Sequence, residues 1–262
     1  MCKECGCGLG GGDVKIGGHS HEHGHDHGHD HAHGHAHRHE DGHSHGGKTL
    51  SLNLSLLEKN ARLAEQNRGF FRAKKLLVLN VVSSPGSGKT TFIRETAVKL
   101  AGKLRVGVIV GDLATDNDAA RLRTAGIPVV QITTGTVCHL DADMIAKAAA
   151  QLDLDKLDVL VIENVGNLVC PADYDLGEDL RVVLLSVTEG EDKPLKYPPM
   201  FHSAHVAVVT KSDMAAAAGF NRELALQNLE RVSHHARIFE LSAKTGDGMK
   251  AWLDFLAEQR AA

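Results

Sequence analysis

The sequence predicts an α/β fold in which a mostly parallel sheet carries helices on both faces. Two observations support this prediction. From residue 76 onward, short runs rich in Val, Ile and Leu alternate with amphipathic segments, and the first run leads through a glycine-rich loop into a helix-like segment. The strand-like runs are 76–82, 105–110, 127–132, 157–162, 181–187, 205–210 and 237–241. The helix-like segments lie near 89–100, 117–125, 141–151, 220–232 and 248–260.

The glycine-rich loop and the start of the helix read Ser-Ser-Pro-Gly-Ser-Gly-Lys-Thr-Thr over residues 83–91. Backbone N–H groups of such a loop turn inward on a polyphosphate, and the helix N-terminus adds a partial positive charge. Ser83 replaces the first Gly of the usual G-x-x-x-x-G-K-[ST] pattern, while the other fixed positions are kept. An accidental Gly-rich turn is disfavoured by the strand before it and the helix after it. We therefore predict a P-loop NTPase whose nucleotide-binding residues include Pro85, Gly86, Ser87, Gly88, Lys89, Thr90 and Thr91.

Acidic residues follow two further strands, where parallel strands end at one edge of the sheet. Lys89 is expected to reach the β- and γ-phosphates, and the Thr90 hydroxyl to ligate Mg²⁺. Asp112 follows the second strand and can bind Mg²⁺ directly or through water, with a contribution from Asp116 or Asp118 in the next loop. Glu163 opens Glu-Asn-Val-Gly after the fourth strand, and Gly166 can offer its N–H to a γ-phosphate. The predicted catalytic set is Lys89, Asp112, Asp116 and Glu163.

Motifs at the ends of two later strands predict which base the nucleotide carries. Thr210-Lys-Ser-Asp213 resembles the guanine-reading N-K-x-D of GTPases, in which the carboxylate accepts hydrogen bonds that adenine cannot donate. Thr210 stands where Asn is usual, and we expect this to weaken the bracing of the loop. Ser242-Ala243-Lys244 resembles the S-A-K turn that backs the base. Each match alone is weak, but their order after a phosphate loop predicts GTP binding by Lys211, Asp213, Ser242, Ala243 and Lys244.

A metal site is predicted on two loops at the same edge of the sheet. Cys138 and His139 lie in one loop, and Cys170 lies four residues past Gly166. A lone cysteine is more often a buried small apolar residue than a ligand, but three soft or borderline ligands in functional loops form an incomplete tetrahedral set. Such a site lets the state of the nucleotide change the affinity for metal. Asp141 is expected to cap a helix rather than to bind metal.

The N-terminus carries two further groups of metal ligands. Cys2, Cys5 and Cys7 lie among glycines, and three thiolates so close together suit Zn²⁺, Ni²⁺ or Cu⁺; unstructured thiols are the alternative. A tract of thirteen histidines follows, interleaved with Gly, Asp and Ala, which predicts disorder and storage of a divalent metal rather than a purification tag or a pH-responsive tail. These histidines are His19, His21, His23, His25, His27, His29, His31, His33, His35, His37, His39, His43 and His45.

Composition bounds the class and the compartment. With 29 basic and 33 acidic residues in 262, the chain shows no general attraction to nucleic acid or to an anionic membrane. No apolar stretch approaches the ~20 residues of a membrane span, and the N-terminus has no signal core. We expect a cytoplasmic protein whose five cysteines are thiols or metal ligands. Its expected segments are a Cys-rich metal-binding motif (1–18), a disordered His-rich tract (19–47), a helical linker (48–75, helical near 58–67 and ended by Gly69) and a GTPase domain (76–262).

Taken together, the motifs resemble the HypB family of hydrogenase nickel-incorporation GTPases. The resemblance covers essentially the whole chain and includes C-x-x-C-G-C, the His-rich insert, S-S-P-G-S-G-K-T-T, G-D-L-A-T-D-N-D-A, T-G-T-V-C-H-L-D-A and E-N-V-G-N-L-V-C-P. It implies that Cys2, Cys5 and Cys7 form a tight nickel site and that Cys138, His139 and Cys170 form a second site for nickel or zinc. It also implies a nucleotide-promoted homodimer, a HypA-type nickel and zinc partner, and delivery of Ni²⁺ to the large subunit of [NiFe] hydrogenase.

Two alternatives stay open at this point. One is a nickel storage protein in which GTP binding is regulatory. The other is a related metallochaperone GTPase that serves urease or a cobalamin enzyme, since a urease accessory protein shares the His-rich start and the phosphate loop. The contexts of Cys138-His139 and Cys170-Pro171 favour the hydrogenase interpretation.

Overall fold

The computed structural model describes residues 15–16 and 46–261. The predicted Cys2, Cys5 and Cys7 site and the predicted disordered histidine tract lie outside the described residues. None of the helices in the described part is long and apolar enough to cross a membrane.

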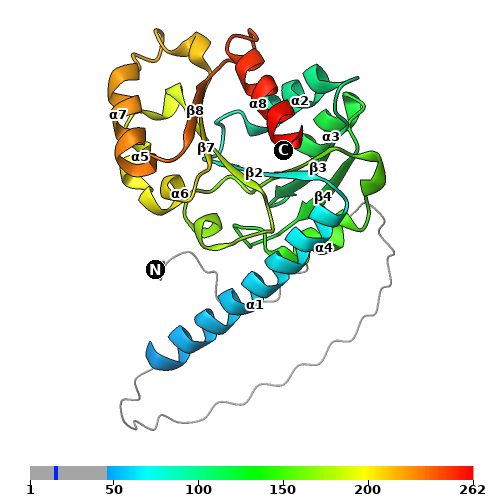
Figure 1. The fold of residues 1–262 in the computed structure, drawn as a ribbon. Coiled ribbons are helices and arrows are strands. Elements are labelled where there is room, and N and C mark those ends of the chain that lie inside the picture. The colour runs from blue at the N-terminus through cyan, green and yellow to red at the C-terminus, as the bar shows by residue number, and fades with distance from the viewer. Residues whose placement is uncertain (1–14, 17–45, 262) are drawn as a thin grey trace, which may run out of the picture.

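A central sheet of eight strands has the order β1-β4-β3-β5-β2-β6-β7-β8 (Figure 1). β2 to β8 pair in parallel, while β1 pairs antiparallel with β4 at one edge. The mostly parallel sheet is therefore confirmed, and each predicted strand is found within two residues of its expected ends. The strands are β1 Lys15–Ile16, β2 Leu77–Ser83, β3 Val106–Asp112, β4 Val129–Thr133, β5 Val159–Glu163, β6 Leu180–Ser186, β7 Val206–Thr210 and β8 Arg237–Glu240.

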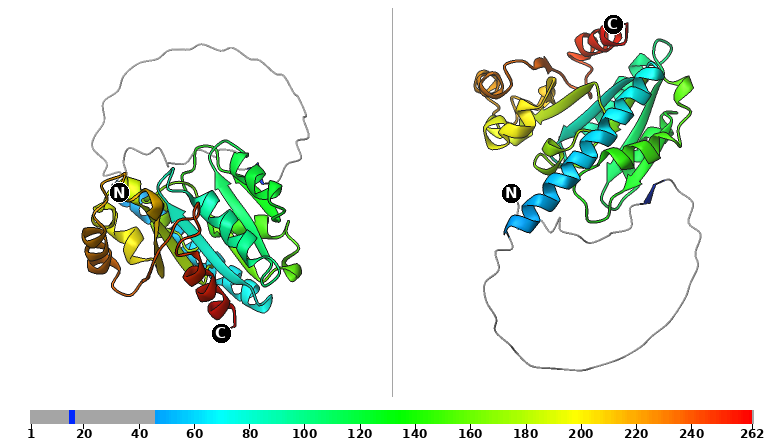
Figure 2. Two further views of the ribbon diagram at one scale, coloured as in Figure 1. Left: turned by 90° about the horizontal axis from the view of Figure 1, so that it is seen from above. Right: turned by 60° about the horizontal axis from the view of Figure 1, so that its bottom comes forward.

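Helices cover both faces of the sheet, as Figures 1 and 2 show. Alternate residues of the strands point to opposite faces, so Leu77, Leu79 and Val81 pack in the apolar layer of α2, α3 and α8, while Val78 packs with α1 and α4. A third apolar cluster lies under α6 and α7. The helices are α1 Gly46–Ala73, α2 Lys89–Leu100, α3 Asn117–Thr124, α4 Ala142–Ala149, α5 Lys193–Lys196, α6 Pro198–His202, α7 Arg222–Ser233 and α8 Met249–Ala261.

The helix before β2 differs from the prediction. It was expected near 58–67 with an end at Gly69, but α1 runs through Gly69 to Ala73. A glycine inside a helix costs about 1 kcal/mol relative to alanine. Burial of Ala64 and Phe71 against the domain outweighs that cost, since both side chains are almost fully shielded from solvent. The chain then turns at Lys75, whose φ is +56°, and enters β2.

The short helices α5 and α6 were not predicted. Each begins with proline in its first turn, where the missing N–H costs no hydrogen bond. They are too short for a helical period to be visible in the sequence. α6 and α7 cover β6 and β7, and α5 lies beside both helices.

An ion pair ties the starts of β3 and β5 together. Asp158 accepts hydrogen bonds from the backbone N–H and the Nε of Arg105, each at 2.9 Å, and from its NH2 at 3.1 Å. Hydrogen bonding by Arg105 lowers the pKa of Asp158 to about 2.

Replacement of Asp158 with Asn is expected to lower the free energy of unfolding by about 1 kcal/mol at pH 7. A depressed pKa in the folded state means that this contribution is present above the unfolded pKa of about 4 and is lost as the pH falls through about 2. Urea unfolding of the parent and of Asp158→Asn should give a difference in the free energy of unfolding that is constant from pH 7 to pH 5. This difference should shrink below pH 4. A difference that persists unchanged at pH 3 would contradict this account.

Candidate functional site

The phosphate loop leaves β2 at the carboxyl edge of the sheet, and its backbone already has the conformation that a polyphosphate needs. Gly86 and Gly88 have φ of +76° and +96°, values that favour glycine. The Lys89 ammonium donates to the Ser83 hydroxyl at 2.9 Å and to the Ser84 carbonyl at 3.4 Å. Burial lowers the pKa of Lys89. Its ammonium is poorly solvated, so an anionic ligand that replaces these two neutral oxygens would interact with it strongly.

Glu163 stands beside this loop, as the sequence predicted. The Thr90 hydroxyl donates to Glu163 Oε1 at 2.7 Å, while Oε2 is buried and has no hydrogen-bond partner among the described residues. Burial raises the pKa of Glu163 to about 7. A hard cation such as Mg²⁺ binds oxygen ligands, and the Thr90 hydroxyl and the unsatisfied Glu163 oxygen are chemically suited to such an ion.

The acidic residues after β3 separate into two groups. Asp112 ends the strand and accepts hydrogen bonds from the backbone N–H groups of Ala114 and Thr115 at 2.9 and 2.8 Å. Asp116 pairs with Arg123 at 2.7 Å, with 58% of its side chain exposed. Asp118, by contrast, acts electrostatically on both Lys89 and Glu163. These electrostatic interactions, together with the ion pair of Asp116, favour Asp118 as the acid that acts with Asp112 on the phosphate-binding residues.

The residues that were predicted to recognise the base lie on the other side of the phosphate loop. The Thr210 hydroxyl donates to the Ser87 carbonyl at 2.9 Å, so this residue braces the phosphate loop although Asn is usual at its position. Lys211 lies along the loop and donates to the Gly86 carbonyl at 2.7 Å. Asp213 accepts from the Ser242 hydroxyl at 2.6 Å. The two motifs that were predicted to read guanine are thus joined by a hydrogen bond that holds the Asp213 carboxylate in place.

Sequence reasoning missed an acid at the end of β6. Both carboxylate oxygens of Glu189 are buried and have no hydrogen-bond partner among the described residues. Burial raises the pKa of Glu189, and Lys193, Lys211 and Lys89 oppose that shift. The available signal was its position directly after a buried strand next to the phosphate-loop strand. An acid among three lysines at this edge limits the excess of positive charge there.

Cys138, His139 and Cys170 come together as predicted. Their ligand atoms all lie within 4.8 Å of one another, and the two sulfurs are 2.9 Å apart. His139 stacks on Tyr174 with ring centroids 3.9 Å apart, and its Nδ1 is buried without a hydrogen-bond partner in the described structure. Burial lowers the pKa of His139, which keeps the imidazole neutral and able to bind metal.

The donor set fits a tetrahedral metal after a small movement. Two thiolates on one tetrahedral ion with bonds of about 2.3 Å are about 3.8 Å apart, so the sulfurs must separate by about 1 Å.

Asp141 caps α4 by accepting from the Met144 N–H at 2.8 Å, as expected of a cap rather than a ligand.

One segment connects the nucleotide and metal residues. A Cβ on Gly166 would lie 3.2 Å from Pro85, so this glycine packs directly on the phosphate loop. Asn167 donates to the Cys138 carbonyl at 3.3 Å. The stretch 163–170 therefore contacts the phosphate loop at one end and carries a predicted metal ligand, Cys170, at the other.

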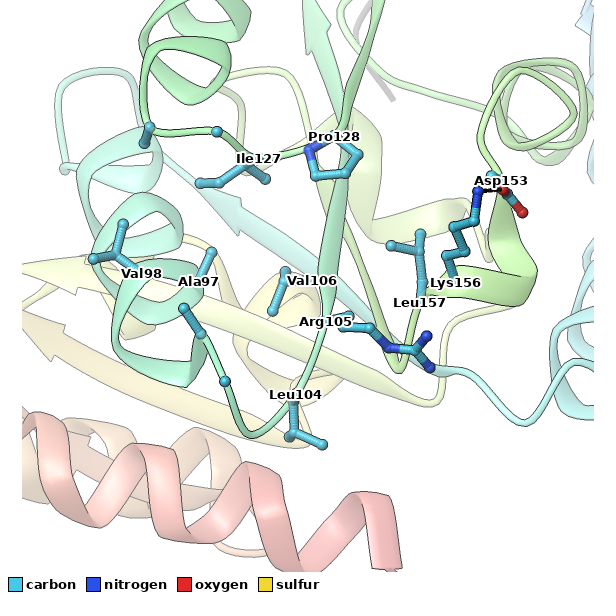
Figure 3. A pocket seen from close by; sticks show the side chains of 14 residues that line it. Ala97, Val98, Leu104, Arg105, Val106, Ile127, Pro128, Asp153, Lys156 and Leu157 are labelled. Atoms are coloured by element: carbon cyan, nitrogen blue, oxygen red, sulfur yellow. Dashed lines mark ion pairs between the residues drawn. The ribbon is translucent and has the colours of Figure 1, made fainter.

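A separate cavity of about 470 Å³ lies at the opposite edge of the sheet (Figure 3). Apolar side chains such as Val98, Leu104 and Ile127 line it, with Arg105 and Lys156 at its side. It is formed where β3 and β4 begin, away from the glycine-rich loop. It is therefore not part of the nucleotide site.

Comparison with known proteins gives consistent matches. The model of the family "CobW/HypB/UreG, nucleotide-binding domain" matches residues 77–240. The hydrogenase maturation factor HypB of Escherichia coli K12 is 51% identical over 215 residues, which are 82% of this chain and 74% of that protein. The hydrogenase/urease maturation factor HypB of Helicobacter pylori is 41% identical over 217 residues, covering 81% of this chain and 89% of the relative.

Solved structures agree with these matches. The crystal structure of HypB from Helicobacter pylori in complex with nickel has a TM-score of 0.74 at 42% identity, covering 78% of this chain and 95% of that one. HypB from Archaeoglobus fulgidus has a TM-score of 0.73 at 39% identity, covering 78% of this chain and 99% of that one.

The brace at Thr210 gives a test of the nucleotide site. Replacement with Val removes the hydroxyl and leaves the buried Ser87 carbonyl without its partner, which is expected to weaken GDP binding by about tenfold. Replacement with Asn, the usual residue at this position, should restore most of the affinity. Titration with a fluorescent GDP analogue measures both variants; equal affinity of the Val variant and the parent would show that the contact does not support binding.

Proposed function

Because the chain belongs to the HypB family within the CobW/HypB/UreG nucleotide-binding domains, we propose that it is a GTP-hydrolysing nickel metallochaperone. In this proposal it delivers Ni²⁺ to the large subunit of [NiFe] hydrogenase during maturation, in a step gated by GTP. The relatives named as hydrogenase maturation factors support the pathway. The relative solved with nickel supports the cargo.

The observation that carries the proposal is the segment from Glu163 to Cys170. Its first residue accepts a hydrogen bond from Thr90 in the phosphate-binding helix, and its last belongs to the metal cluster. Gly166 packs on Pro85 between them. A γ-phosphate that pulls Gly166 toward the loop would therefore change the position of Cys170, and the sulfurs must move apart for metal to bind. This coupling is the physical basis of the proposed gate.

The chemistry proposed for hydrolysis is electrostatic. Lys89 and the loop N–H groups stabilise the charge of the transferring phosphoryl group. Thr90 would hold Mg²⁺, with Asp112 and Glu163 arranged to order it or its water, and the ion would neutralise the β- and γ-phosphate oxygens. Glu163 is also a candidate for ordering the attacking water, together with Asp112 and Asp116. Guanine specificity would come from Asp213, braced by Ser242.

The remaining assignments follow from the family and from the sequence. We propose a cytoplasmic, nucleotide-promoted homodimer that works with a HypA-type partner, with Zn²⁺ as a second ion for the cluster of Cys138, His139 and Cys170. Cys2, Cys5 and Cys7 would bind nickel tightly, and residues 19–47 would store it. Residues 48–75 and 76–262 would form the linker helix and the GTPase domain.

Service to urease is the second candidate function, because the Helicobacter pylori relative is named a hydrogenase/urease maturation factor. Nickel storage is a third, and deletion of residues 19–45 separates it from delivery. If the tract is a buffer, the deletion lowers hydrogenase maturation when nickel is scarce and spares it when nickel is ample. Loss of maturation at every nickel level would instead assign delivery to the tract.

The gate is tested in the full chain with Cys2, Cys5 and Cys7 replaced by serine, so that Cys138 and Cys170 are the remaining thiols. Thiolate-to-nickel charge-transfer absorption then reports this site alone. The nickel affinity with GDP and with a non-hydrolysable GTP analogue is expected to differ by about 5- to 150-fold, and Cys170→Ala should abolish the difference. Identical affinities in both nucleotide states would overturn the gating proposal.

Base recognition gives a second test. Asp213→Asn exchanges one acceptor oxygen for a donor and is expected to weaken GTP binding by about 100-fold or more, because one of the two guanine donors then faces the Asn amide N–H₂ instead of an acceptor. Xanthosine triphosphate, which presents an acceptor instead of the exocyclic amine, should bind the variant better than the parent. Competition against a fluorescent nucleotide measures both. Unchanged GTP affinity would remove Asp213 from the base site.

A further inference from the structure

Two buried asparagines of α1 each join the two segments that carry the metal ligands. Asn60 and Asn67 are 7% and 6% exposed. They are seven residues apart, which is about two turns, and therefore lie on the same face of the helix. That face packs on the segment after His139 and on the segment after Cys170.

The hydrogen bonds of Asn60 link one segment to the other. Its Oδ1 accepts from the backbone N–H of Ala142 at 2.9 Å, and its Nδ2 donates to the carbonyl of Asp175 at 2.8 Å. Ala142 is three residues after His139, and Asp175 is five residues after Cys170.

Asn67 repeats this link two turns later. Its Nδ2 donates to the carbonyl of Ala142 at 2.8 Å and to that of Leu176 at 3.1 Å. The N–H and the C=O of Ala142 are thus both bonded to α1, and so are two successive carbonyls of the other segment.

Neighbouring contacts hold the second segment at a fixed distance from the helix. Arg68 donates to both carboxylate oxygens of Asp175 at 2.8 Å. Gly177 has φ of +89°, and a Cβ there would lie 2.7 Å from the Ala64 carbonyl oxygen. Tyr174, next to Asp175, stacks on His139. The helix therefore fixes the backbone on both sides of the cluster.

We infer that Asn60 and Asn67 are positioning residues of the metal site formed by Cys138, His139 and Cys170. They set the separation of the two ligand segments, since a buried amide that bonds both backbones cannot shift relative to one without losing a hydrogen bond to the other. Outer residues that orient metal ligands affect affinity by about 10- to 100-fold. The inference rests on the proposed metal site and adds α1 to it.

The test uses the full chain with Cys2, Cys5 and Cys7 replaced by serine, with Ni²⁺ as the probe. Asn67→Ala and Asn60→Ala are each expected to weaken nickel binding by about tenfold or more and to shift or weaken the thiolate-to-nickel absorption, as measured by competition with a chelator. GDP affinity should change less than twofold, because the hydrogen bonds of both asparagines end on residues 142, 175 and 176.

Asn228→Ala is the matched control. Asn228 is 4% exposed and donates to the Glu191 carbonyl at 2.9 Å, but it lies in α7 beneath β6 and β7. It should lower the melting temperature as the α1 variants do, without changing nickel affinity or the absorption band. If Asn67→Ala does not fold, Asn60→Ala decides the question, because it removes the other bridge and leaves that of Asn67 in place.

Three results would count against the inference. Nickel affinities of the α1 variants within twofold of the parent overturn it while leaving the metal site intact. A loss of affinity equal to that of Asn228→Ala overturns it as well, because the effect is then general destabilisation. Absence of a thiolate-to-nickel band in the parent overturns the proposed metal site itself and the inference with it.

Discussion

The position of β2 is the constraint on which the rest of this structure depends. Every residue from Leu77 to Ser83 is buried, because the strand lies between β5 and β6 with helices on both faces. The chain places β3, β4 and β5 on one side of β2 and then crosses to the other side, where β6, β7 and β8 follow in order. Ligands of open parallel sheets bind where the order reverses in this way. The phosphate loop therefore emerges with Glu163 on one side and Glu189 on the other.

Polar groups at that edge are kept in a poorly solvated state. Burial lowers the pKa of Lys89 and raises those of Glu163 and Glu189, so each group is less stable in its charged form than in water. A nucleotide phosphate beside Lys89 and a metal ion beside the glutamates would offset the cost of burying these charges, because each brings the opposite charge. The unsatisfied oxygens of both glutamates indicate that the edge is built for occupants rather than for the empty state.

Much of the fold could be predicted from local pattern. The apolar and amphipathic patterns predicted the parallel strands and the helices α2, α3, α4, α7 and α8 within two residues, and the phosphate loop was recognisable from its glycines and Lys89. Gly69 misled because tertiary burial of α1 outweighs a local helix preference. The hydrogen bond from Thr210 to the phosphate loop could not be predicted, because it depends on how the fold places β7 beside that loop. Glu189 and the two asparagines of α1 carry no motif, and their roles depend on which segments the fold brings beside them.

The spacing of Asn60 and Asn67 has a consequence for how the sequence of α1 can vary. Each residue advances a helix by about 100°, so a single insertion between the two would turn one amide away from Ala142 while the other stayed in register. Additional residues before Asn60 leave the spacing untouched. Length variation among natural or engineered versions of this chain should therefore be tolerated at the beginning of α1 and selected against between its two asparagines.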